Sequence, residues 1–202
     1  AVVIEASESE TGMIASRIGC ESDAKYAIQI TNVGSGYSRL TDDFLYNAWN
    51  FEGQEVFKRA VKAMAQASAD VLDQAGMSLE DVKLVVPHQA NKRILDALAK
   101  RIGISEDKVF VNVHKYGNTS AGTIQVALAE ALEEGRIKPD DHILMASFGA
   151  GLTYGAGLIK WSNRVIPLTT SDAELPPCEK TGLEIIASHV DRYKKHSLES
   201  VS

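Results

Sequence analysis

Three short apolar runs in the middle of the chain each end in a polar or glycine-rich loop, and helical patterns separate them. The runs cover residues 82–86, 109–113 and 143–146. Each has the length and composition of a buried strand. Strands that alternate with helices indicate an α/β fold, a layered sheet with helices on its faces. Ligands of open α/β sheets commonly bind where strands end, so the three loops are candidate functional segments.

Apolar residues at helical spacing fill the intervals and predict helices over 55–72, 91–101 and 119–134. Gly76 and Gly103 stand where a glycine commonly ends a helix. Thr119 and Ser120 can cap the third helix. A last strand is predicted over 153–161.

The two ends of the chain have different patterns. Residues 1–6 are apolar and β-branched and predict a strand, weaker strand patterns cover 13–19 and 26–33, and 34–47 has the composition of a loop. Because the sequence opens at Ala1 inside a strand pattern, we expect it to be cut from a longer protein. Residues 162–202 contain three prolines and a helical pattern, which predicts an appendage to a domain over 1–161.

Composition excludes several functional classes. The chain has 202 residues, of which 45% are apolar and 24% charged, as in ordinary soluble domains. A net charge of -6 argues against nucleic acid as a partner, and no apolar run approaches the roughly 20 residues that span a bilayer. The histidines are scattered and the two cysteines are far apart, so we predict no metal site and no disulfide framework.

Two polar residues at predicted strand ends could carry chemistry. His88 can act as an acid, a base or a hydrogen-bond donor, although a lone histidine is more often bonded to a backbone carbonyl. Asn118 precedes Thr-Ser, which favours a cap or a turn, but its amide could also donate to a carbonyl oxygen.

The third loop, Phe148-Gly149-Ala150-Gly151, does not fit the dinucleotide-binding spacing and is followed by a strand. Its backbone N–H groups could form an oxyanion hole, or the loop could be a tight hairpin. Basic residues cluster on the helix after His88, among them Lys92 and Arg93. This cluster is either a solvated face or a docking site for an acidic carrier.

Taken in order, Val86-Pro87-His88-Gln89-Ala90-Asn91, Tyr116-Gly117-Asn118-Thr119-Ser120-Ala121 and Phe148-Gly149-Ala150-Gly151 resemble the C-terminal half of a β-ketoacyl-[acyl-carrier-protein] synthase III. The resemblance implies a thiolase-like fold, with one βαβαβαββ half over 1–161. Residues 1–6 match a strand near the end of the other half. The long tail resembles the extended second isoform of some marine gamma-proteobacteria.

That resemblance implies an initiating condensing enzyme of bacterial fatty acid synthesis. In this family a cysteine of the N-terminal half takes an acyl group from acyl-CoA, and the acyl group then condenses with malonyl-[acyl-carrier-protein] as CO2 is lost. His88 and Asn118 match the pair that supports decarboxylation, and the N–H of Ala150 matches an oxyanion-hole amide. CoA and phosphopantetheine thioesters are then substrates, and no cofactor is expected.

Further positions match the family's substrate tunnel and carrier-protein contacts. The tunnel positions are Gly53, Phe57, Ala90 and Asn91. The carrier-protein contacts are Lys58, Gln89, Ala90, Asn91, Lys92 and Arg93. The resemblance also implies a cytoplasmic homodimer.

Two hypotheses follow. The chain is either the C-terminal half of this enzyme or a catalytically inactive module that docks carrier protein or a condensing-enzyme partner. His88, Asn118 and the glycine-rich loop together favour the enzyme, since docking alone needs only the basic face. On either hypothesis we expect the isolated chain to be inactive, and poorly soluble because a face meant for the other half is exposed.

Overall fold

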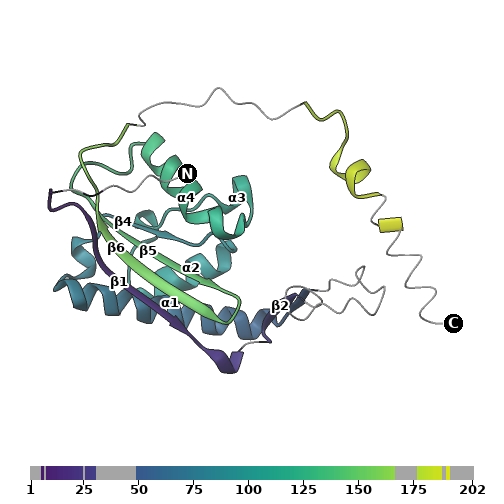
Figure 1. Cartoon of the computed structure of the whole chain (residues 1–202), viewed down its shortest axis with the longest axis horizontal. Helices are drawn as coiled ribbons and strands as arrows, with labels where there is room; N and C mark the ends of the chain where they lie inside the picture. Colours follow the sequence, from purple (N-terminus) through teal and green to yellow (C-terminus); the bar gives the residue numbers. More distant parts are fainter. Residues whose placement is uncertain are drawn as a thin grey trace. The chain divides into compact units, whose positions relative to one another are not determined.

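The computed structural model describes residues 6, 8–24, 26–30, 49–166, 177–187 and 190–191. It divides into two compact units, Ala1–Ile166 and Pro167–Ser202. The described part of the first unit contains a four-stranded sheet in the order β1-β6-β5-β4 (Figure 1). These strands are β1 (Gly12–Cys20), β4 (Leu84–Pro87), β5 (His142–Gly149) and β6 (Thr153–Lys160). β6 is antiparallel to β1 and β5, whereas β4 and β5 are parallel. A small separate sheet pairs β2 (Ile28–Ile30) with β3 (Trp49–Phe51).

Helices cover both faces of the large sheet, as the sequence predicts. Two of them, α1 (Gly53–Ala75) and α2 (Lys92–Ile102), lie on one face, and α4 (Thr123–Glu133) lies on the other (Figure 1). The alternation of side chains along β4 explains the layers. Val85 packs in the cluster that contains residues of α1 and α2, whereas Leu84 and Val86 pack with α4.

The predicted ends of α1 and α2 are confirmed. Gly76 follows α1 with φ 62°, and Gly103 follows α2 with φ 81°. Both values lie in the left-handed region that glycine adopts without strain. At the start of α2, the Asn91 side chain accepts a hydrogen bond from the N–H of Ile94 (3.0 Å).

The strand predicted over 109–113 is wrong for most of its length. Val109 makes a single bridge to Val85, and the short helix α3 (Val113–Tyr116) begins where the strand was expected to continue. A side chain, rather than a neighbouring strand, hydrogen-bonds to the backbone N–H groups at the end of this segment. The Oε1 atom of Gln89 accepts hydrogen bonds from the N–H groups of Asn112 (2.9 Å) and Val113 (3.2 Å), so no neighbouring strand is needed there.

The predicted cap of the third helix is also wrong. A 3₁₀ turn over Ser120–Gly122 precedes α4, which begins at Thr123 without a side-chain cap. Ser120 has φ 55°, which is incompatible with the extended backbone of an N-cap residue.

Other predictions fall partly outside the described residues. The strand predicted over 1–6 and the loop over 34–47 lie outside them, except that Ala6 is described and is not in a strand. In the second unit residues 182–187 are helical, which agrees with the pattern there. The helix is preceded by a reciprocal pair of bonds between Thr181 and Glu184, a capping box.

No helix in the described part of the chain is long and apolar enough to cross a membrane. Among the described strands, β1 lies at one edge of the sheet, and it exposes large apolar side chains. Met13 is 61% exposed and Ile18 is 82% exposed. An apolar edge strand is a site of unwanted pairing between chains.

We therefore expect the purified chain to self-associate, and Ile18→Lys to reduce this. Because the Ile18 side chain is already exposed, the substitution should change the free energy of unfolding by less than about 0.5 kcal/mol. Light scattering over a concentration series measures association, and urea unfolding measures stability. Self-association that persists unchanged in Ile18→Lys would show that the chains do not associate through β1.

Candidate active site

The loops after β4 and β5 meet because these strands are parallel neighbours. His88 follows β4 directly, and its N–H donates to the carbonyl of Ala146 in β5 (2.8 Å). Phe148 is two residues further along β5, and its ring meets the His88 ring edge-on, with centroids 5.3 Å apart. The sheet thus brings His88 beside the start of the Gly149–Gly151 loop.

The His88 ring is held at one nitrogen. It is only 8% exposed, and its Nδ1 atom lies 2.6 Å from the Oγ1 atom of Thr123, the buried first residue of α4. Burial lowers the pKa of the imidazole below its ordinary value, so His88 is neutral at pH 7. Within the described residues, no hydrogen bond occupies the other ring nitrogen, Nε2.

Asn118 forms a turn, as one of the two interpretations predicts. Its Oδ1 atom accepts a hydrogen bond from the N–H of Ser120 (2.9 Å), and the residue is exposed. This bond uses the oxygen of the amide. The Nδ2 group remains a donor, with no acceptor among the described residues.

A buried carboxylate anchors the segment that leads into Asn118. Glu130 of α4 accepts hydrogen bonds from Asn112 Nδ2 (2.8 Å) and Lys115 Nζ (2.5 Å). Chiefly because of the Lys115 ammonium, the pKa of the Glu130 carboxyl is lower than usual, so Glu130 is ionised. Both ends of α3 are thereby tied to α4, which restricts where the following Gly117-Asn118 turn can lie.

The glycine-rich loop is a tight hairpin between β5 and β6. The carbonyl of Ala150 accepts from the N–H (3.3 Å) and the hydroxyl (3.1 Å) of Thr153. At Gly151, φ is 135° and a Cβ atom would lie 2.8 Å from the Thr153 methyl group, so only glycine fits. The N–H of Ala150 has no acceptor in the described part of the chain, and its φ is not positive, so alanine causes no strain.

His88 is therefore linked to both other loops, through Phe148 to the hairpin and through Thr123 to the segment after Asn118. No hydrogen bond between described residues joins His88, Asn118 and Ala150 to one another. Thr123 is not among the residues that the sequence singles out, and Phe148 enters there only as part of the glycine-rich loop. A threonine in the first turn of an amphipathic helix and a phenylalanine in a strand carry no signal that distinguishes them from ordinary core residues.

Two of the four expected tunnel positions pack against the same apolar cluster as Phe148. Phe57 and Ala90 are half-buried and, like Phe148, pack against an apolar cluster formed by α1, α2 and Ala146. Gly53 is the exposed first residue of α1, and Asn91 is the N-cap of α2.

The expected carrier-protein contact at Gln89 is wrong, because its side chain is internal. Gln89 is 1% exposed, and its amide donates to the carbonyls of Pro87 (2.9 Å) and Phe110 (3.0 Å). Its oxygen accepts the two backbone bonds that end the 109–113 segment. The Gln89 side chain therefore joins the end of β4 to the 110–113 backbone and is not available to a partner.

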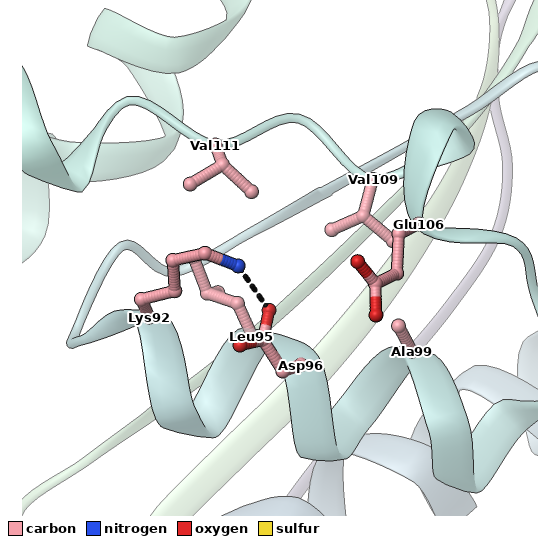
Figure 2. Close-up of a pocket in the computed structure, with 7 residues that line it drawn as sticks. All are labelled: Lys92, Leu95, Asp96, Ala99, Glu106, Val109 and Val111. Carbon is pink, nitrogen blue, oxygen red and sulfur yellow. Dashed lines mark hydrogen bonds and ion pairs between the residues drawn. The ribbon is translucent and has the colours of Figure 1, made fainter.

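The basic residues differ in their availability. Lys58 and Arg93 are exposed, and neither is in an ion pair with any described residue. Lys92 instead pairs with Asp96 (2.6 Å), beside a cavity of about 80 Å³ between α2 and the 106–111 segment (Figure 2). Lys92 is the only proposed site residue that lines this cavity, so the cavity is separate from the His88 region.

Comparison with known proteins identifies the family. Residues 72–161 match the family described as "3-Oxoacyl-[acyl-carrier-protein (ACP)] synthase III C terminal". Residues 72–161 belong to this synthase III family. The crystal structure of the synthase III from Aquifex aeolicus matches with a TM-score of 0.69 and 40% identity, over 77% of this chain and 46% of that one. The Pseudomonas aeruginosa synthase III matches with a TM-score of 0.72 and 31% identity, over 81% and 48%. The fold is therefore the thiolase-like fold of the synthases.

Curated relatives extend the match into the tail. The β-ketoacyl-[acyl-carrier-protein] synthase III 2 of Vibrio cholerae is 45% identical over 98% of this chain and 55% of its own length. The synthase III of Roseiflexus castenholzii is 42% identical over 80% of this chain and 50% of its own. The chain thus spans about half the length of the curated relatives it matches. Coverage of 98% includes most of residues 162–202, so the tail is shared with the Vibrio synthase III 2, as the resemblance implies.

Proposed function

We propose that this chain is the C-terminal half of an enzyme that condenses acyl-CoA with malonyl-[acyl-carrier-protein] to give 3-oxoacyl-[acyl-carrier-protein]. One observation carries the proposal. His88, Asn118 and Ala150 each have one polar atom bonded inside the chain and one hydrogen-bond donor, or potential donor, left over. Such donors, held in place before the substrate arrives, are what an enzyme needs to stabilise negative charge on a thioester oxygen.

His88 and Asn118 would serve the decarboxylation step. When the C–CO2 bond of the malonyl thioester breaks, its electron pair moves into the thioester and makes an enolate oxygen. A neutral His88 donates from Nε2 when the Thr123 hydroxyl donates to Nδ1. Asn118 donates from Nδ2, because its oxygen is engaged with Ser120. Two neutral donors can stabilise the enolate without supplying it with a proton.

The N–H of Ala150 would serve acyl transfer. The family's nucleophilic cysteine, expected in the half that this chain does not span, attacks acyl-CoA and releases the CoA thiolate. The carbanion from malonyl carrier protein then attacks the resulting acyl thioester, a carbon–carbon bond forms and the cysteine leaves as thiolate. Both attacks place negative charge on the acyl oxygen, where a backbone N–H stabilises it.

Acyl carrier protein would dock on the exposed cations near α1 and α2. Lys58 and Arg93 have no ion-pair partner among the described residues, so their charges are available to an acidic partner. From the resemblance to the synthase III family, we also propose that the substrates are carrier-protein and CoA thioesters and that the whole enzyme is a cytoplasmic homodimer.

The test is a fusion protein in which residues 1–202 follow the half of the Vibrio cholerae relative that they do not match. We expect it to condense acyl-CoA with malonyl carrier protein, as followed by mass spectrometry of the carrier. A fusion protein that binds carrier protein without condensation would favour the docking module.

In this fusion protein, Arg93→Glu should raise KM for malonyl carrier protein about tenfold and leave the reaction with malonyl-CoA unchanged, because only the carrier protein needs the basic surface. Arg164→Glu makes the same charge change at another exposed arginine and should not alter KM. An equal rise in both variants would point to net charge rather than to a docking site.

A further inference from the structure

Arg59, on the half-buried side of α1, binds three carboxylates at once. Its Nε atom donates to Glu55 (2.5 Å), and its Nη1 atom donates to both Glu21 (2.8 Å) and Asp23 (3.2 Å). The Nη2 atom lies 3.0 Å from the second Asp23 oxygen and completes the ion pair. The Glu55 contact lies within one helix turn and is of the kind that adds little. The contacts to Glu21 and Asp23 connect α1 to the turn that follows β1.

The backbone of Glu21 is in turn bonded to the hairpin. The N–H of Glu21 donates to the carbonyl of Leu152 (2.8 Å), and the N–H of Leu152 donates to the carbonyl of Glu21 (3.2 Å). The Leu152 side chain is fully buried, in a cluster with Ala24, Ala27 and Val56 of α1. Leu152 is thus fixed through both its backbone and its side chain, and Ala150 is two residues away.

Charge and burial give the Arg59–Glu21 contact more strength than an ordinary surface pair. The two side chains are 28% and 27% exposed, so water screens them only in part. A guanidinium that donates to several carboxylates in fixed directions also orients its partners. By contrast, Arg17 in β1 pairs with Asp70 of α1 at 3.6 Å while half-exposed, which is a weak contact between neighbouring elements.

We propose that Arg59 is a positioning residue for the oxyanion hole, acting through Glu21 and Leu152 on the N–H of Ala150. The role in catalysis rests on the proposed function. The hairpin has a glycine on each side of Ala150, and therefore needs an external support to hold one conformation. The Glu21–Leu152 bonds supply that support, and Arg59 holds Glu21 in place.

The first test uses the 202-residue chain itself and does not depend on its activity. In Arg59→Gln and in Glu21→Gln, the Leu152 and Thr153 amides should exchange with deuterium at least about tenfold faster than in the parent chain. Arg17→Gln removes the weaker pair between β1 and α1 and should leave this exchange unchanged. Amides within β5 report whether the fold is intact. Unchanged exchange at Leu152 in both variants would overturn the proposal.

The second test uses the fusion protein and separates positioning from general stability. Arg59→Gln and Glu21→Gln should each slow acylation of the cysteine by acyl-CoA about tenfold, a fraction of the effect of losing an oxyanion donor outright. The double variant should be no slower than either single one, because both act through the same contact. The dissociation constant for carrier protein, which depends on Lys58 and Arg93, should stay within about twofold.

The outcomes are distinguishable. Faster exchange with normal acylation would overturn the catalytic part of the proposal. Additive losses in the double variant would overturn the Arg59–Glu21 route. If no variant of the fusion protein, including the parent, is acylated, the proposed function fails, and the exchange measurement still decides whether Arg59 holds the hairpin.

Discussion

Replacing His88 by alanine in the fusion protein is expected to slow decarboxylation of malonyl carrier protein by about 10²–10³-fold while the cysteine is still acylated by acyl-CoA. Of the two proposed enolate donors, His88 is the buried one, and Thr123 and Phe148 hold its imidazole. Removing one donor of this kind typically slows the charged step by about 10²–10³-fold. In the proposed mechanism, acyl transfer relies instead on the N–H of Ala150, which the substitution leaves in place.

Release of labelled CO2 measures the first step, and intact mass of the acylated protein measures the second. His142→Gln is a matched control, since His142 is at the opposite end of β5. Condensation at the parent rate in His88→Ala would contradict the assignment.

If His88 has this role, its imidazole should also set an acid limit on decarboxylation. Burial lowers the pKa of His88, so the neutral form persists below the ordinary histidine pKa of about 6.5. The acid limb of the decarboxylation rate should therefore have its midpoint below that value. The same pKa shift predicts how stability depends on pH. Below about pH 6.5 the unfolded chain takes up a proton that the buried ring resists, so the free energy of unfolding falls as the pH is lowered.

The 202-residue chain alone is expected to have no condensing activity, whereas the fusion protein is active. In the proposed mechanism the chain supplies the donors for the enolate and one amide for the acyl oxygen, whereas the nucleophilic cysteine belongs to the half that the chain does not span. The chain's own cysteines, Cys20 and Cys178, are both exposed. Without a thiolate beside the hairpin, no acyl-enzyme forms and the carbanion has nothing to attack.

Purified chain, fusion protein and a fusion protein whose upstream cysteine is replaced by alanine should be assayed together. The fusion protein alone should yield 3-oxoacyl carrier protein. Condensation by the purified monomeric chain would mean that one of its own cysteines, or another group, is the nucleophile.

The layered sheet, the long helix and the glycine stops could all be predicted from the sequence, because each depends on local periodicity or on one backbone conformation. His88 and Asn118 could also be singled out as candidates, since polar residues after apolar runs stand out. The resemblance to a family, rather than spacing, gave them roles.

What the sequence could not predict depends on contacts between distant residues. The 109–113 segment has strand composition, yet Gln89 takes its backbone N–H groups and ends the strand early. Gln89 itself looks like a surface residue beside a basic helix, and only the fold buries it. In the sequence, Arg59 looks like a solvated residue on a helix. Its partner Glu21 is 38 positions away in the chain, so local spacing does not predict their contact.

The most direct test of the account is a crystal structure of the fusion protein with a non-reactive malonyl thioester analogue bound. We expect the thioester oxygen to lie about 3 Å from both His88 Nε2 and Asn118 Nδ2, the distance of a hydrogen bond. The Asn118 oxygen should remain on the Ser120 N–H, and Nδ1 of His88 on Thr123. A thioester oxygen bound elsewhere, with neither side chain donating to it, would contradict the central claim.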